Sequence, residues 1–270
     1  MLIDCHCHSA HSFDGHELVE QICRRAEELG FGVLAITDHC DLYPARYPLD
    51  EVRAAVCASV DETAKLRESW DGGLKLLTGF ELGEAVDYPD IAEEILALRE
   101  VDVVLGSIHR AGDIVDFYYL DCKGESLDRI NILMDDYFDR LLRLVDWGKF
   151  NVLTHLTYPL RYIVGDAGIP LELGHWQDKI DALFARIIEK GIALEVNASG
   201  LRQKIGRPLP DEPLLRRYLE LGGRLVSLGS DAHRYEDIGS GVEACQRMLK
   251  GLGFQEACYF VKRQPQMVRL

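Results

Sequence analysis

The stretch Val33-Leu34-Ala35-Ile36-Thr37-Asp38-His39 shows the pattern that decides the fold, because a short apolar run ends in polar residues that can bind metal. The pattern recurs at both ends of the chain. Leu2-Ile3 leads into His6-Cys7-His8, and residues 225–228 lead into Gly229-Ser230-Asp231-Ala232-His233. Short apolar runs bounded in this way are typical of buried strands.

Seven such runs alternate with segments of helical periodicity. The runs begin at Leu2, Val33, Leu74, Val101, Val152, Ile192 and Leu225, and helices are predicted near 17–29, 51–70, 91–99, 127–147, 176–190, 214–221 and 242–252. Strands that alternate with helices predict a parallel sheet, and this many units predict an α/β barrel. No linker interrupts the pattern, so we expect a single domain over residues 1–270.

The polar ends of these runs supply nine candidate metal ligands. They are His6, His8, Asp14, His39, Glu81, His109, His155, Asp231 and His233. In an α/β barrel the carboxyl ends of all strands meet at one face, so these side chains are expected in one cluster. Imidazole and carboxylate ligands together suit Zn, Mn or Fe. One four-coordinate ion needs at most four ligands, so the set indicates more than one ion.

The bulk composition limits the remaining function classes. The net charge is −15, with 45 acidic and 30 basic residues, which argues against nucleic acid and anionic membranes as partners. No apolar stretch is long enough to cross a bilayer, and residues 1–4 lack the pattern of a secretory signal. We therefore expect a cytoplasmic protein whose eight cysteines are free thiols.

The ordered motifs resemble one family over the whole chain. H-x-H at 6–8, S-x-D-G at 12–15, T-D-H at 37–39, G-x-E at 79–81, G-S-x-H at 106–109, a lone His155 and G-S-D-A-H at 229–233 are similar to the polymerase-and-histidinol-phosphatase (PHP) superfamily. Residues 194–202, L-E-V-N-A-S-G-L-R, and the pair Arg161-Tyr162 after His155 resemble its histidinol-phosphatase branch.

The resemblance implies a distorted (β/α)7 TIM-like barrel and a site with three divalent ions. By position, one ion would be held by His6, His8, Glu81 and Asp231; a second by Glu81 as a bridge, His109 and His155; and the third by Asp14, His39 and His233. Arg161 matches the phosphate-binding arginine of the family. Arg202 is either a second phosphate contact or a surface residue.

The expected activity is hydrolysis of a small phosphomonoester, with L-histidinol phosphate as the leading substrate. Water activated by the metal ions would attack phosphorus, and Arg161 would hold the phosphoryl oxygens. Asp231 and His233 complete the expected catalytic set, and His233 or a water is the candidate proton donor to the leaving alcohol. Without metal the three carboxylates would repel phosphate, so the ions must reverse the local charge.

Two alternatives remain open from the sequence. The substrate could be another phosphoester, such as a nucleotide, a sugar phosphate or phosphotyrosine, or the chain could be a metal-binding regulatory module without activity. His11, His16 and His175 do not match the motifs, and we expect them to be solvated or to lie behind the ligands. Tyr118 and Tyr119 either line the substrate pocket or pack. The sequence does not decide the oligomeric state.

Overall fold

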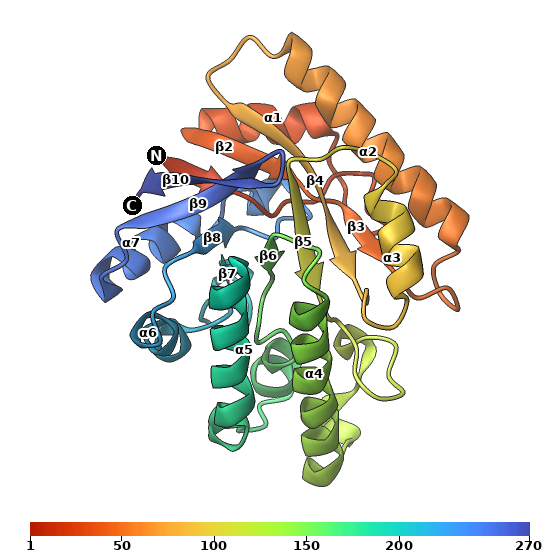
Figure 1. The fold of residues 1–270 in the computed structure, drawn as a ribbon, viewed down its shortest axis with the longest axis vertical. Coiled ribbons are helices and arrows are strands. Elements are labelled where there is room, and N and C mark those ends of the chain that lie inside the picture. The colour runs from red at the N-terminus through yellow and green to blue at the C-terminus, as the bar shows by residue number, and fades with distance from the viewer.

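Seven parallel strands form the central sheet of the computed structural model, which describes residues 1–270 (Figure 1). They lie in the order β1 (Leu2–Asp4), β2 (Phe31–Ile36), β4 (Lys75–Gly83), β5 (Val103–Ser107), β6 (Val152–Leu153), β7 (Ala193–Asn197) and β8 (Val226–Gly229). Sequential strands are neighbours, and every pair on this path is parallel. The alternation predicted from the apolar runs is confirmed.

Backbone contacts between the first and last strands close the sheet into a barrel. The amide of Cys5 donates to the carbonyl of Leu228 at 2.8 Å, and the amide of Asp231 donates to the carbonyl of His6 at 2.8 Å. Cys7 forms a further parallel bridge with Ala232. These contacts lie at the carboxyl ends of β1 and β8, so closure brings the first and last polar motifs together.

Seven α-helices surround the barrel at the places that the periodicity predicts. They are α1 (Val19–Glu28), α2 (Leu49–Ser69), α3 (Pro89–Leu96), α4 (Leu127–Trp147), α5 (Gln177–Lys190), α6 (Glu212–Glu220) and α7 (Val242–Leu252). The side chain of Ser126 caps α4 by accepting from the amide of Arg129, and α4 ends at Gly148, whose φ is 66°. The helices bury their apolar faces in one continuous core of 72 residues.

The remaining elements are short. Single turns of 3₁₀-helix occur at η1 (Phe117–Tyr119), η2 (Cys122–Gly124), η4 (Leu173–Trp176), η5 (Ser199–Leu201) and η6 (Tyr235–Asp237), and η3 (Arg161–Asp166) is a π-helical segment. A short strand, β3 (His39–Asp41), pairs with the second half of β4. None of the helices is both long and apolar enough to cross a membrane.

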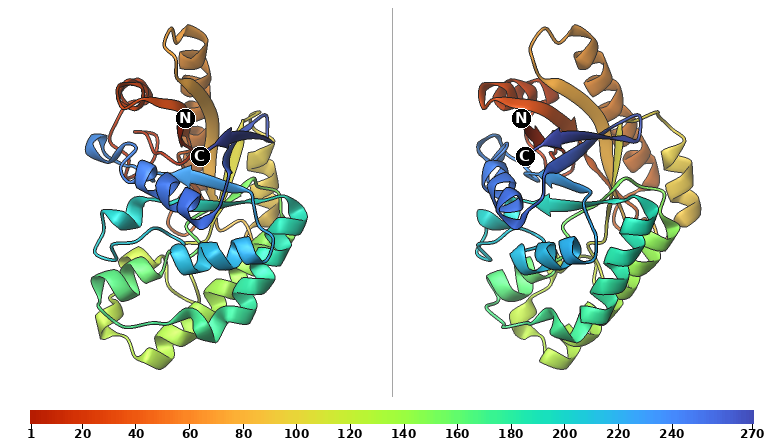
Figure 2. Two further views of the ribbon diagram at one scale, coloured as in Figure 1. Left: turned by 90° about the vertical axis from the view of Figure 1, so that its left-hand side faces the viewer. Right: turned by 60° about the vertical axis from the view of Figure 1, so that its left-hand side comes forward.

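An antiparallel hairpin follows the barrel at the C-terminus. It consists of β9 (Glu256–Val261) and β10 (Gln264–Arg269), and it lies close to both chain ends in Figure 2. The amides of Lys262 and Arg263, in its turn, donate to the side chain and carbonyl of Asp102 at 3.0 and 2.8 Å. Since Asp102 precedes β5, the hairpin is attached to the amino-terminal end of the barrel. The opposite end is left open for the polar motifs.

Candidate metal centre

All nine predicted ligands lie at the carboxyl-terminal end of the barrel. Seven of them line a cavity of about 690 Å³, and His6 and His8 are buried against Glu81 and Asp231. Each comes from a strand end or from the loop that follows it: His6 and His8 after β1, Asp14 in the next loop, His39 in β3, Glu81 in β4, His109 after β5, His155 after β6, and Asp231 and His233 after β8. The clustering predicted from strand-end placement is therefore what the fold produces. Within the cluster, three groups of side chains could each hold a metal ion.

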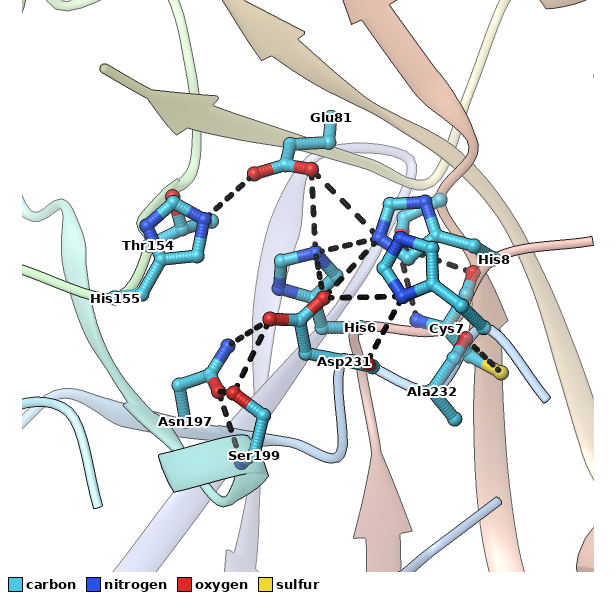
Figure 3. Close-up of polar contacts among 12 residues, drawn as sticks. His6, Cys7, His8, Glu81, Thr154, His155, Asn197, Ser199, Asp231 and Ala232 are labelled. Carbon is cyan, nitrogen blue, oxygen red and sulfur yellow. Dashed lines mark hydrogen bonds and ion pairs between the residues drawn. The ribbon is translucent and has the colours of Figure 1, made fainter. Parts of the chain in front are cut away.

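The first group is built around His6 and His8, as Figure 3 shows. Their Nε2 atoms are 3.0 Å apart. Glu81 Oε2 lies 3.4 Å from the Nε2 of His6, and Asp231 Oδ1 lies 3.5 Å from the Nε2 of His8. His6, His8 and Glu81 are almost completely buried.

The second group shares Glu81 with the first. Glu81 Oε1 lies 2.9 Å from the Nε2 of His155 and 3.3 Å from the Nε2 of His109. The Nε2 atoms of His109 and His155 are 3.4 Å apart. One carboxylate therefore presents one oxygen to each group, which is the arrangement of a bridging ligand.

The third group lies nearest the mouth of the cavity. The Nε2 atoms of His39 and His233 are 3.3 Å apart, and Asp14 oxygens lie 3.7 and 3.5 Å from them. His8 also faces this group, because its ring stacks on that of His233 with centroids 4.0 Å apart. His8 therefore lies between the first and third groups, whereas the resemblance placed it in the first alone.

The second nitrogen of one imidazole in each pair faces a hydrogen-bond acceptor. The Nδ1 atom of His6 lies 2.7 Å from Glu195, that of His109 lies 3.2 Å from Asp41, and that of His233 lies 3.1 Å from the carbonyl of Asp231. Each acceptor places the hydrogen on Nδ1 and turns the Nε2 lone pair into the cluster. This is the usual support of a metal-binding histidine.

The donor set fits divalent cations. Two ligand atoms bound to zinc at tetrahedral angles are about 3.3 to 3.6 Å apart, since zinc–ligand bonds are about 2.0 to 2.2 Å. The ligand atoms here are separated by 2.9 to 3.7 Å. Glu81 Oε2 is buried without a well-directed hydrogen bond and lies 3.1 to 3.7 Å from nitrogens of His39, His6 and His8, a position that suits a cation held between them.

The charges in the cluster depend strongly on one another. Burial by itself would raise the pKa of Glu81, but the neighbouring His6 and His109 hold that pKa well below its usual range. Burial would likewise lower the pKa of His39, whereas Asp41 and Glu81 raise it to about 10. Opposite charges therefore decide both pKa values, and in the absence of metal ions protons on the imidazoles would balance the carboxylates.

Glu195, a buried carboxylate within the motif at residues 194–202, has a role that the motif alone did not predict. Its Oε1 lies 2.7 Å from the Nδ1 of His6. Its Oε2 accepts hydrogen bonds from the backbone amide of His155 at 2.7 Å and from the side chain of Asn197 at 3.1 Å. It therefore positions ligands of two groups. The signal was an acidic residue inside the otherwise apolar run that became β7.

Asp41 and Asp38 support other candidate ligands, Asp41 by direct contact and Asp38 through a serine. Asp41 lies 3.2 Å from the Nδ1 of His109 and 3.4 Å from the Nδ1 of His39. Asp38 accepts from the side chains of Ser9, Ser12 and Ser59 at 2.5 to 2.7 Å, and Ser12 in turn lies 3.2 Å from the Nδ1 of His8. These roles could not be predicted from the sequence, because they depend on contacts between separate strands.

Arg161 lies against the cluster of candidate ligands, as its motif position predicts. Its Nη2 donates to Ser199 at 2.7 Å and to Asp231 at 3.2 Å, while its buried Nε has no hydrogen-bond partner. The guanidinium also packs over the ring of Tyr158 at 5.1 Å. Arg161 therefore lines the cavity and has a hydrogen-bond donor, Nε, that is free to bind a ligand.

Arg202 also lines the cavity but is more fully engaged. It donates to the carbonyls of Ser230 and Asp231, both at 2.7 Å, and pairs with Asp237 at 3.3 Å. Asp231 has a φ of 54°, a strained conformation for a residue other than glycine. These contacts hold Asp231 in that conformation, so Arg202 has a supporting role that the two alternatives from the sequence did not include.

The histidines outside the motifs lie apart from the ligand cluster or at its margin. His11 pairs with Glu62 at 2.6 Å on the surface, and His175 packs edge-on against Trp176. His16 lines the cavity, as do Tyr118 and Tyr119. The pocket-lining alternative for the two tyrosines is the one that the structure supports.

Comparison with known proteins decides the family. The family model described as PHP domain matches residues 4–199, well over half of the chain. The chain belongs to the PHP domain family. This confirms the resemblance inferred from the ordered motifs.

Individual PHP relatives are similar over nearly the whole chain. A protein of Thermotoga maritima named probable histidinol-phosphatase is 32% identical over 257 residues, which cover 94% of each chain. A histidinol-phosphatase of Lactococcus lactis is 24% identical over 273 residues, covering 96% of this chain and 94% of its own. The predicted placement in the histidinol-phosphatase branch of the PHP family is thereby confirmed.

Solved structures show the same fold. The crystal structure of histidinol phosphate phosphatase from Lactococcus lactis, complexed with zinc, L-histidinol and phosphate, has a TM-score of 0.80 at 22% identity and covers 98% of both chains. A putative histidinol phosphatase from Listeria monocytogenes has a TM-score of 0.75 at 18% identity, covering 90% of this chain and 99% of its own. The distorted seven-stranded barrel is thus the fold that the resemblance implied.

Proposed function

We propose that the protein is a metal-dependent phosphomonoesterase that hydrolyses L-histidinol phosphate to L-histidinol and phosphate. The observation that carries this proposal is the convergence of six imidazoles and three carboxylates in one cluster, seven of which line the same cavity as Arg161. The relatives that are similar over the whole chain are named histidinol-phosphatases, which supports the choice of substrate. The place of this reaction is histidine biosynthesis.

The proposed ligand sets follow the three groups. His6, His8, Glu81 and Asp231 would hold one ion; Glu81, His109 and His155 a second; and Asp14, His39 and His233 a third, with His8 also within reach. Divalent Zn, Mn or Fe bound there would supply Lewis acidity toward water and phosphate. In a protein of net charge −15, the carboxylates of the cavity would otherwise repel a phosphate dianion.

The residues of the chain would bind and orient the phosphate. Arg161 is suited to the phosphoryl oxygens, because a guanidinium offers several donors in one plane and its Nε is unpaired here. Ser199 and Asp231 fix the position of the guanidinium from the other side. Asp231 therefore contributes both to the ligand set and to the alignment of Arg161.

A water beside His233 is the proposed source of the proton for the leaving alcohol. His233 is the most exposed of the six imidazoles, with 25% of its side chain accessible, and it lines the cavity. Its Nδ1 is held by the carbonyl of Asp231 and its Nε2 belongs to the third ligand set, so a metal-bound His233 would have no N–H free for the alcohol. Of the two candidates, the water is therefore the one that the proposed ligand sets favour.

A phosphoester panel tests the proposal. Protein loaded separately with Zn, Mn or Fe is assayed with L-histidinol phosphate, nucleotides, sugar phosphates and a phosphotyrosine peptide. We expect the highest kcat/KM for L-histidinol phosphate, and a loss of activity in Asp231→Asn but not in Glu243→Gln, which changes an exposed acid on α7. Equal or faster turnover of nucleotides would contradict the assignment of L-histidinol phosphate as the substrate. If no ester were hydrolysed, the proposal that the protein is an enzyme would be wrong.

A further inference from the structure

One wall of the cavity is formed by tyrosines and a carboxylate, unlike the end where the candidate metal ligands lie. Asp116, which caps the short helix η1, lies there with Tyr118, Tyr158 and Tyr162. The hydroxyl of Tyr158 donates to Asp116 Oδ1 at 2.8 Å, while the ring of Tyr158 lies 4.9 Å from that of His109. Tyr158 therefore separates the ligand cluster from Asp116.

Asp116 is distinguished from the other carboxylates of the cavity by its partners. Asp14, Asp41, Glu81 and Asp231 all face imidazoles, and Asp166 pairs with Lys204 at 3.1 Å. Asp116 forms no ion pair. Its Oδ1 accepts from Tyr158 and from the amide of Tyr118 at 2.7 Å, and its Oδ2 accepts no hydrogen bond. Asp116 is partly buried, and a carboxylate in such a place with one oxygen free of hydrogen bonds is suited to pair with a cation.

The tyrosines around Asp116 suit the same kind of ligand. The rings of Tyr158 and Tyr162 lie 5.2 Å apart, and that of Tyr118 lies 6.0 Å from Tyr162, all in edge-on arrangements. Tyr118 is 64% exposed although it borders the cavity. Because the ring of Tyr158 already packs against Arg161, Tyr118 and Tyr162 are the rings left to attract an ammonium group or to stack on a planar cationic ring.

We propose that Asp116, together with Tyr118, Tyr158 and Tyr162, forms the subsite that binds the cationic amino group of the substrate's alcohol. This rests on the proposed function, in which the phosphate lies against the ligand cluster and Arg161. Histidinol carries an ammonium group and an imidazole, whereas the sugars of nucleotides and sugar phosphates carry neither. Asp116 would therefore select substrates with a positively charged alcohol.

The wild-type protein provides the first test. L-histidinol phosphate is compared with the analogue that lacks only the amino group, 3-(imidazol-4-yl)propyl phosphate, and with p-nitrophenyl phosphate. We expect kcat/KM to be about 10- to 100-fold higher for the amine, the range of a hydrogen bond to a charged group. Equal kcat/KM for the amine and its analogue would overturn the subsite, whatever the variants do.

The isosteric variant Asp116→Asn provides the second test. Its amide oxygen still accepts from Tyr158 and from the amide of Tyr118, so the loop keeps its contacts while the charge is lost. We expect kcat/KM for L-histidinol phosphate to fall about 10- to 100-fold, mainly through KM, and kcat/KM for the two amine-free esters to change less than about twofold. The matched control Asp166→Asn removes an exposed pocket acid that already has a partner, and should keep the preference for the amine. Equal losses on all three esters in Asp116→Asn would overturn the proposal.

Product binding separates this proposal from the proposed function. Calorimetry measures L-histidinol and its amine-free analogue binding to the metal-loaded protein and to Asp116→Asn. The subsite is supported if L-histidinol binds more tightly than its amine-free analogue to the wild type and this difference disappears in Asp116→Asn. This holds even if another ammonium-bearing phosphoester proves to be the better substrate. Equal binding of both alcohols to the wild type would contradict the subsite while leaving phosphatase activity intact.

Discussion

Glu195 shows how one buried side chain can align residues of two candidate metal-binding groups. A carboxylate accepts hydrogen bonds at both oxygens, and Glu195 uses them for the ring of His6 and for the backbone of His155. Neither contact could be found from the sequence, because they join β1, β7 and the loop after β6. The residue type at the strand position was visible, but its partners were not.

Glu195→Gln should weaken metal binding. An amide accepts at only one of its two ends, so either the Nδ1–H of His6 or the amide of His155 would face a donor. Loss of such a supporting contact lowers metal affinity about 10- to 100-fold. Competition with a chelator, read as metal content, measures this. Glu189→Gln, an exposed change at the end of α5, is the control, and equal affinities in the two variants would contradict the role.

Arg161→Gln should reduce phosphate turnover without removing the metals. Arg161 donates to Ser199 and Asp231 but is not itself a candidate ligand. Loss of one positioned donor to a developing charge costs about 10²- to 10³-fold in kcat. Steady-state kinetics and metal analysis of the same sample give both readouts, with Arg186→Gln as the surface control. A variant with full activity, or one that has lost its metal, would contradict the phosphate role.

At the scale of elements, the strands tolerate little change where the barrel packs closely. Gly106 in β5 lies against the ring of Phe150, and a Cβ there would meet ring carbons at 2.6 Å. Both residues are buried in the core region behind the site. The motif G-S-x-H therefore needs this glycine for packing, beyond its value as a family signature.

Gly106→Ala should lower stability without adding or removing any polar group. Overpacking of a core typically costs about 1 to 3 kcal/mol. The control is Gly251→Ala in α7, where nothing lies within 4 Å of the new methyl group. That change should stabilise the helix by about 0.5 to 1 kcal/mol. Denaturant unfolding measures both, and equal effects of the two alanines would contradict the packing argument.

The elements that the sequence did not predict are short or polar. The hairpin of β9 and β10 follows the last of the seven predicted runs and is not among them. β10 (Gln264–Arg269) is mostly exposed, so it lacks the apolar pattern that marks a strand. β3 has only three residues, which is too short for periodicity to detect. Both strands exist because neighbouring strands offer backbone hydrogen bonds.

At the scale of the whole molecule, barrel closure brings like charges together. Glu81, Asp231 and Asp14 lie among six imidazoles at one end of a protein with a net charge of −15. Bound cations would favour the folded state, since the unfolded chain does not preserve the three groups. Folding and metal binding are therefore expected to be linked.

Chelation should lower the melting temperature, and zinc or manganese should restore it. A ligand present at 100 times its Kd stabilises the folded state by about 2.7 kcal/mol for each site. Calorimetry of metal-free and reloaded protein measures the shift. Glu81→Gln, which alters the carboxylate shared by two groups, should respond less to added metal. Identical melting temperatures with and without metal would contradict the linkage.

The sequence by itself determined the order of strands and helices and the nine ligand candidates. Periodicity and residue type are local properties, and strand-end placement in a barrel converts them into a cluster. The tertiary structure decided what supports each ligand: Glu195 behind His6, Asp41 behind His109, and Arg202 behind Asp231. It also showed that Asp116 is the carboxylate of the cavity that forms no ion pair with another side chain. Those facts depend on distances between residues far apart in the chain, which are set only when β1 and β8 meet and the barrel closes.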